Sequence, residues 1–201
     1  IRSLYFDEGS NALWIGRFVN LTRFDVAANK FEDFDITHNN LQGSNNIKVI
    51  RPESDKFLWI GTEAGVFLYD KTLLPSDKSA MRFYSNKGNG FRGEGESVSI
   101  SDILPEDKYV WFATEEFITD DAPEFNLGGL FRYNRKATWD KFDKRNGLKA
   151  NGISSITRVG RYMFASQYDF DPKSKAENGR GISMFDRITG KPLRFDPEEI
   201  K

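Results

Sequence analysis

The chain has 201 residues, 38% of them hydrophobic and 14% aromatic with 18 phenylalanines, so it can form one domain with a sizeable core. Its 29 basic and 30 acidic residues nearly cancel to a net charge of -1, which leaves no basic surplus to attract nucleic acid or an anionic membrane. The absence of cysteine excludes disulfides and thiolate chemistry, and no apolar run reaches the roughly 20 residues of a membrane-spanning helix.

Turn residues divide the chain into short apolar segments of a length typical of strands. In the first half, strands are predicted at 1–6, 12–15, 21–25, 31–35, 47–50, 57–61, 66–70 and 81–85. In the second half, they are predicted at 98–103, 109–114, 130–134, 139–143, 153–159, 162–166, 182–186 and 193–196. No stretch has a helical period over 11 or more residues, so we expect an all-β protein.

A repeated motif groups these segments in fours. Leu-Trp-Ile-Gly at 13–16 returns at 58–61 and, in weaker form, at 110–113 and 163–166. The aromatic anchors are 45, 52 and 53 residues apart, and about 40–50 residues is the span of one four-stranded propeller blade. We therefore predict one β-propeller segment over 1–201, made of four antiparallel blades. Their approximate limits are 1–43, 44–93, 94–151 and 152–201.

The second strand of each predicted blade is the central packing element. Leu58, Trp59 and Ile60 are apolar at consecutive positions, which indicates a strand covered on both faces. Blades that stack on one another provide such cover. The third strands end on an aromatic residue followed by Asp or Asn, as in Tyr69-Asp70, and this pairing suits a strand that runs into a turn.

These motifs carry a family resemblance. Leu-Trp-Ile-Gly-Thr-x-x-Gly-Val at 58–66, the Tyr69-Asp70 pair, and Asn-Gly-Leu at 146–148 ahead of Ile153 resemble the two-component-regulator propeller repeat. The resemblance covers essentially the whole chain and is strongest in the second repeat. It implies a β-propeller from the extracytoplasmic sensor part of a bacterial hybrid two-component regulator, or from a secreted protein, and hence a periplasmic or extracellular location. The motif specifies blades and implies no catalytic residue.

Four blades leave three arrangements open. The chain can be part of a larger propeller, a tight four-bladed ring, or half of a ring that a second copy completes. The family usually has more blades, and the chain begins at Ile1 rather than Met, so the partial propeller is the favoured interpretation. A lone arc would expose the apolar faces of its end blades.

Enlarged connections point to a binding face. The connection between the second and third strands grows over 115–129 and 167–181, and in a propeller these loops share one rim with the blade-to-blade connections. Carboxylates mixed with aromatic rings there suit a sugar-like or cationic ligand, or a protein partner. The predicted ligand-binding residues of this rim are His38, Asn40, Arg92, Asp120, Asp121, Phe125, Asn146, Tyr168, Asp169 and Asp171.

Other motifs have less support. The Gly-x-Gly-x-x-Gly run at 88–93 leads into a strand rather than a helix, so it does not predict a dinucleotide site. Asp169 and Asp171 with Ser174 and Glu177 hint at calcium, but the run lacks the glycine and spacing of an EF-hand loop, so no cofactor is predicted. Residues 172–179 also read as a plain surface insertion.

The leading hypothesis is a non-catalytic β-propeller that binds a small or glycan-like ligand, or a protein, on this rim. The alternative is a propeller lyase or glycoside hydrolase. It would use His38, the one histidine, as a base or a pair of carboxylates, although no nucleophile, base and orienting partner stand together in the sequence. A third reading is purely structural, with blades that only pack against further blades.

Overall fold

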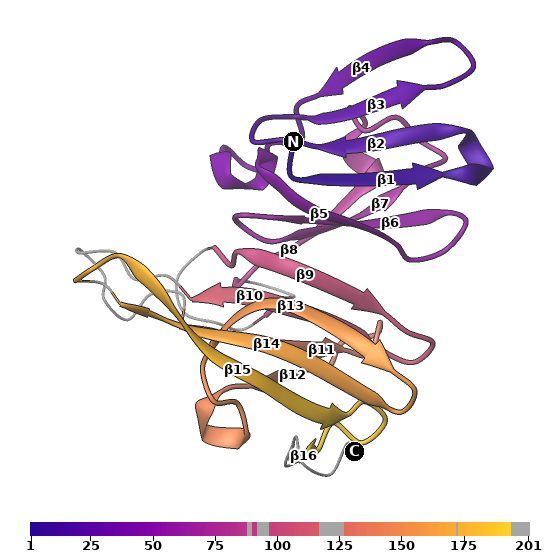
Figure 1. Cartoon of the computed structure of the whole chain (residues 1–201). Coiled ribbons are helices and arrows are strands. Elements are labelled where there is room, and N and C mark those ends of the chain that lie inside the picture. Colours follow the sequence, from indigo (N-terminus) through magenta and orange to yellow (C-terminus); the bar gives the residue numbers. More distant parts are fainter. Residues whose placement is uncertain (88–89, 92–96, 117–126, 172, 194–201) are drawn as a thin grey trace.

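The computed structural model describes residues 1–87, 90–91, 97–116, 127–171 and 173–193. These residues form four antiparallel four-stranded sheets, named sheets 1 to 4 in chain order, and neighbouring strands within each sheet follow the order of the chain (Figure 1). Sheet 1 contains β1 (Ser3–Asp7), β2 (Ala12–Gly16), β3 (Leu21–Asp25) and β4 (Lys30–Phe34). Sheet 2 contains β5 (Ile47–Pro52), β6 (Phe57–Thr62), β7 (Val66–Asp70) and β8 (Met81–Tyr84).

The second half of the chain repeats this order. Sheet 3 contains β9 (Ile100–Pro105), β10 (Val110–Glu116), β11 (Leu127–Tyr133) and β12 (Trp139–Phe142). Sheet 4 contains β13 (Gly152–Val159), β14 (Tyr162–Asp171), β15 (Ala176–Asp186) and β16 (Pro192–Leu193). Short 3-10 turns lie at Glu8–Ser10, Gln42–Asn45, Lys78–Ala80 and Lys144–Asn146. The predicted all-β, four-blade architecture is confirmed, and no helix in the described residues is long and apolar enough to cross a membrane.

The middle strands hold the sheets together, as the apolar runs predicted. Trp59 and Ile60 of β6 are 1% and 0% exposed, because sheet 1 covers one face of sheet 2 and sheet 3 covers the other. Trp59 meets Phe112 of sheet 3 edge-on, with ring centroids 5.2 Å apart. Trp14 meets Tyr69 of sheet 2 edge-on at 5.4 Å, and Trp59 makes the equivalent contact with Tyr133 of sheet 3 at 6.5 Å. One aromatic per sheet therefore packs onto the next sheet.

The four sheets form an open arc rather than a closed ring. Figure 1 shows sheet 1 and sheet 4 at opposite ends of the molecule, with sheets 2 and 3 between them. The apolar clusters join consecutive sheets, and the last of them places Met163 and Phe185 of sheet 4 against Trp111 of sheet 3. A tight four-bladed ring is therefore not the arrangement of this chain.

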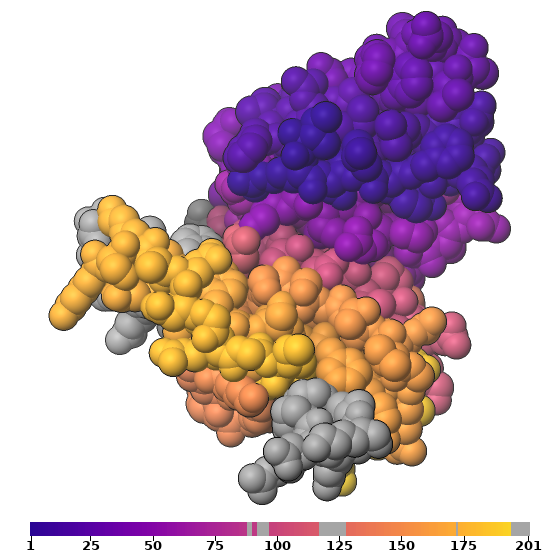
Figure 2. Space-filling model, in the orientation of Figure 1, coloured from indigo at the N-terminus to yellow at the C-terminus, as the bar shows by residue number. Residues whose placement is uncertain are grey.

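The fourth sheet corrects one expectation. Residues 167–181 are largely strand rather than loop, since β14 and β15 continue to pair as far as Asp171 opposite Ala176. The Gln167 side chain is held between Ser183 Oγ at 2.6 Å and the carbonyl of Ala150 at 2.9 Å. These bonds satisfy the buried side chain of Gln167, whereas residues 177–181 of β15 are exposed. The resulting hairpin projects beyond the rest of the surface (Figure 2).

Candidate ligand-binding rim

The alternating strand directions place two kinds of connection at one end of every sheet. These are the turns from the second to the third strand and the crossings from one sheet to the next, and we call this end the insertion end because it carries the β14–β15 hairpin (Figure 1). The first-to-second and third-to-fourth connections lie at the opposite end, here called the turn end.

A row of polar residues runs along the innermost strands at the insertion end. The pairing of the first strand with the second shifts register at Lys48 in sheet 2, at Ser101 in sheet 3 and at Ser154 in sheet 4. Each shift is a β-bulge, which re-aims a side chain out of the regular pleat. Arg2 precedes β1 at the equivalent position in sheet 1, where its N–H donates to Gly16. We call these four residues the inner row.

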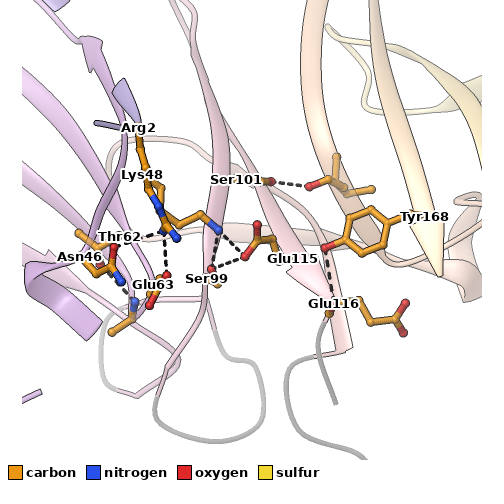
Figure 3. Close-up of polar contacts among 12 residues, drawn as sticks. Arg2, Asn46, Lys48, Thr62, Glu63, Ser99, Ser101, Glu115, Glu116 and Tyr168 are labelled. Atoms are coloured by element: carbon orange, nitrogen blue, oxygen red, sulfur yellow. Dashed lines mark hydrogen bonds and ion pairs between the residues drawn. The ribbon is translucent and has the colours of Figure 1, made fainter. Parts of the chain in front are cut away.

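The first two members of the inner row make equivalent ion pairs to the next sheet. The Arg2 guanidinium donates to Glu63 Oε1 at 2.8 Å and to Asn46 Oδ1 at 3.2 Å. The Lys48 ammonium pairs with Glu115, and Figure 3 shows both groups sharing a hydrogen-bonded triangle with a hydroxyl. That hydroxyl, Ser99 Oγ, accepts from Lys48 at 3.1 Å and donates to Glu115 at 2.7 Å. The cations of the first two members of the inner row are thus each paired with a carboxylate of the next sheet.

The series changes between sheets 3 and 4. Ser101 replaces the cation and donates to the carbonyl of Ile153 instead (Figure 3). Tyr168 stands where Glu63 and Glu115 stand in the earlier sheets, and its hydroxyl donates to the Glu116 carbonyl at 3.5 Å. This junction therefore replaces an ion pair by neutral hydroxyl groups, next to the hairpin.

Glu116 is a buried carboxyl at this junction. It is 8% exposed, and the Phe170 N–H donates to its Oε2 at 3.4 Å. Burial raises the pKa of Glu116, and the nearby Asp169 carboxylate raises it further, whereas the Phe170 N–H and Lys144 oppose the shift. The carboxyl group therefore holds its proton to a higher pH than an exposed glutamate does.

Asp169 is the charged centre of the hairpin base. Lys144 lies 2.7 Å from its Oδ1 and Arg180 lies 2.6 Å from its Oδ2. Burial opposes the ionisation of Asp169, but the bonds to these two cations outweigh it and lower the pKa of the carboxyl. Asp169 is thus an ionised, doubly paired group at neutral pH.

The structure brings only part of the predicted rim together. Tyr168 and Asp169 lie side by side with Glu116, whereas Asp171 accepts bonds from Lys173 N–H at 2.9 Å and Ser174 Oγ at 2.7 Å within its own turn. Among the described residues, no group of three or more His, Cys, Asp or Glu side chains could hold a metal ion. Arg92, Asp120, Asp121 and Phe125 lie outside the described residues.

The remaining predicted residues lie in the crossings between sheets at the insertion end. The His38 ring packs at a tilt of 33° against the Phe83 ring, with centroids 4.6 Å apart, and it lines a groove of about 220 Å³ beside the outer strands of sheet 2, so the residue is half-buried. Asn40 is exposed in a turn with φ of 64°. Asn146 caps the 3-10 turn after Asp143, whose N–H donates to its Oδ1 at 2.6 Å.

Sequence reasoning missed the inner row itself. A signal was available, because an isoleucine followed by a polar residue opens every sheet at 1–2, 47–48, 100–101 and 153–154. A Thr-Glu pair also recurs at 62–63 and 114–115. The dipeptides are too short to stand out without the bulges that align them.

Four sheets that stack through their middle strands define a β-propeller arc. No protein-family model and no curated protein matches the sequence. Among solved structures, the chain is similar to the extracellular domain assigned to a one component system, BT4673 from B. thetaiotaomicron, with 19% identity over 99% of this chain and a TM-score of 0.63.

Two further solved structures share the fold. One is the extracellular domain assigned to a hybrid two component system, BT3049 from B. thetaiotaomicron, with 13% identity over 97% of this chain and a TM-score of 0.65. The other is a chain of the Mitotic Checkpoint Complex, with 10% identity over 96% of this chain and a TM-score of 0.55. The chain spans 23% and 24% of the two bacterial domains. At these identities the likeness establishes the fold.

Proposed function

We propose that residues 1–201 are a segment of a two-component-regulator-type β-propeller with a non-catalytic sensor or secreted binding role outside the cytoplasm. The blade motifs support the family, and the fold is shared with domains whose names describe them as extracellular. The inner row is the single observation that carries a binding role. Strands at these positions could have packed with apolar side chains, yet all four sheets place a polar group there.

The proposed ligand is a small, hydroxyl-rich molecule such as an oligosaccharide. Paired charges such as Lys48 with Glu115 offer both donors and acceptors at fixed positions, and the Ser154, Ser155 and Ser166 hydroxyls form an accessible cluster with oxygens 2.5 and 3.0 Å apart. The hairpin base at Tyr168 stands at the same end of the molecule. A sugar presents the matching alternation of hydroxyl donors and acceptors along its ring.

The test is a thermal-shift screen of the chain against a panel of oligosaccharides, followed by calorimetric titration of any hit. We expect a hit to raise the melting temperature of the wild-type chain. The shift is expected to disappear when a two-residue turn replaces residues 169–179, and to persist in the control Lys108→Ala at the turn end. A hit that survives the hairpin deletion would place binding elsewhere, and a blank panel would reject the glycan class.

A further inference from the structure

Ion pairs at the turn end join each pair of neighbouring sheets in the same way. In every case a carboxylate in the first turn of one sheet meets a cation that follows the third strand of the next sheet. The pairs are Asp7 with Lys71, Glu53 with Arg135, and Glu106 with Arg187. The three acids are only 7%, 13% and 4% exposed, so each junction buries a charge that its neighbour neutralises.

Each of the two uncovered faces of the arc lacks its member of this ion pair: sheet 1 lacks the cation and sheet 4 lacks the carboxylate. In sheet 1 the residue after the third strand is Val26, which is 42% exposed, where the other sheets have a cation. In sheet 4 the equivalent position, opposite Tyr162, is Val159, which is 60% exposed, where the other sheets have a carboxylate. A carboxylate buried against Val26 would be unpaired, and so would a cation buried against Val159. The open face of sheet 1 therefore excludes a neighbouring sheet that carries the usual carboxylate, and the open face of sheet 4 excludes one that carries the usual cation. The two open faces fit each other.

The open face of sheet 1 is an apolar row across all four strands. Phe6, Leu13, Phe24 and Phe31 are paired in register, and Phe6 and Phe31 are 48% and 62% exposed. In sheet 2 the equivalent row is Pro52, Leu58, Tyr69 and Met81. The Trp14 ring on the second strand of sheet 1 covers this row. The internal repeat thus indicates that a sheet with an aromatic residue on its second strand covers the open row.

The open face of sheet 4 presents such a residue. Met163 faces sheet 3, so its neighbour Phe164, at the position of Trp14 and Trp59, lies on the opposite face. Tyr162 and Ile182 flank it and are 42% and 41% exposed.

The inner edge of sheet 4 also matches the internal junctions. Ser101 bonds the carbonyl of Ile153 in the next sheet, and Ser3 accepts from the Ile50 N–H of the next sheet at 3.0 Å. In sheet 4 the same two positions are Ser154 and Ser155. Each hydroxyl already bonds Ser166 Oγ and retains the capacity for one further bond, equivalent to those of Ser101 and Ser3, to a further sheet.

We propose that the open face of sheet 4 of one chain packs on the open face of sheet 1 of a second copy. Two such contacts related by a two-fold axis close a ring of eight sheets, which lies within the range of known propellers. The contact is apolar at the turn end, where Val26 meets Val159, and hydroxyl-mediated at the inner edge. The apolar sheet faces carry it, and at the inner edge it shares Ser154 and Ser155 with the hydroxyl cluster of the proposed ligand site.

Light scattering coupled to size-exclusion chromatography tests the contact on the whole chain. We expect the wild-type chain to have twice its monomer mass. Phe31→Asp and Tyr162→Asp should each weaken dimerisation at least about tenfold, because each places a charge in the buried contact. Both side chains are exposed in the single chain, so circular dichroism should stay unchanged. The matched control Leu74→Asp, at a 63% exposed leucine outside both faces, should remain dimeric.

Mixing the two variants distinguishes this contact from others. The Phe31→Asp chain retains an intact sheet 4 face and the Tyr162→Asp chain retains an intact sheet 1 face, so the mixture should form a heterodimer through one contact. A monomeric wild type would overturn the proposal and favour further blades of a longer protein as the cover. A dimer that tolerates Tyr162→Asp would also overturn it.

Discussion

Replacing Glu53 with alanine tests the energetic basis of the sheet junctions. Glu53 accepts a bond from Trp59 Nε1 at 2.7 Å, and the Arg135 Nη2 atom lies 3.1 Å from the same carboxylate. The substitution leaves the indole N–H without a partner and removes the counter-charge of Arg135. The single substitution therefore removes the hydrogen bond of Trp59 and the ion pair with Arg135 together.

The loss of unfolding free energy in Glu53→Ala depends on the contacts that Trp59 and Arg135 keep after the substitution. Among the described residues, the indole N–H groups of Trp14 and Trp111 have no hydrogen-bond partner and the fold tolerates this. Leaving the N–H of Trp59 without a partner should therefore cost about 1 kcal/mol, the lower end of the usual range. Arg135 is 27% exposed and keeps a bond to the Asp107 carbonyl, so losing the ion pair should cost about 1–2 kcal/mol. The free energy of unfolding should fall by about 2–3 kcal/mol.

Calorimetry at one protein concentration measures this change. For a chain of this size we expect Glu53→Ala to lower the melting temperature by about 4–12 °C. The matched control is Glu63→Ala, which breaks the Arg2 pair at the insertion end, where the side chains are 26% and 38% exposed; it should cost less than about 1 kcal/mol. If Glu53→Ala melted within 1 °C of the wild type, or if Glu63→Ala cost as much, the junction argument would fail.

Three other predictions concern packing and pH. A Cβ at Gly61 would lie 2.5 and 2.8 Å from carbons of neighbouring strands, so Gly61→Ala should cost at least about 1–3 kcal/mol in urea unfolding, whereas Gly179→Ala, with open space around it, should cost far less. Burial raises the pKa of Glu116 above its ordinary 4.5, so its stabilising effect is present below that pH and lost as the pH rises; Glu116→Gln should therefore be more stable than wild type at pH 7 and nearly equal to it at pH 4. Bonds from Arg161 and from backbone N–H groups lower the pKa of Asp186 to about 2, so Asp186→Asn should be destabilising at pH 7, and the difference from wild type should vanish as the pH falls toward 2.

The blade architecture was readable from local pattern. Continuous apolar segments such as that around Trp59 predict strands covered on both faces, because only stacked sheets bury every side chain of a strand. The repeat spacing then groups these strands in fours. The hairpin at 167–181 escaped this reasoning, because residues 177–181 are exposed and have no apolar strand pattern, and only their pairing with β14 makes them a strand.

The candidate site was only partly readable. Tyr168 and Asp169 were identified from composition, but Lys48 and Glu115, which are 67 positions apart in the sequence, meet because the bulge at Lys48 directs its side chain toward sheet 3. The aromatic contact of His38 with Phe83 could not be predicted, because the residues next to His38 in the sequence are polar.

By itself, the sequence determined the strands, their grouping into four blades and the doubly covered middle strands, since these depend on the hydrophobicity and turn chemistry of adjacent residues. Only the tertiary structure decided that the arc is open, that Val26 and Val159 stand where the other sheets carry paired charges, and that Arg2, Lys48, Ser101 and Ser154 form one row. These features depend on the register between strands and on contacts between sheets. In the sequence they leave only short repeated dipeptides, which do not by themselves show which residues meet.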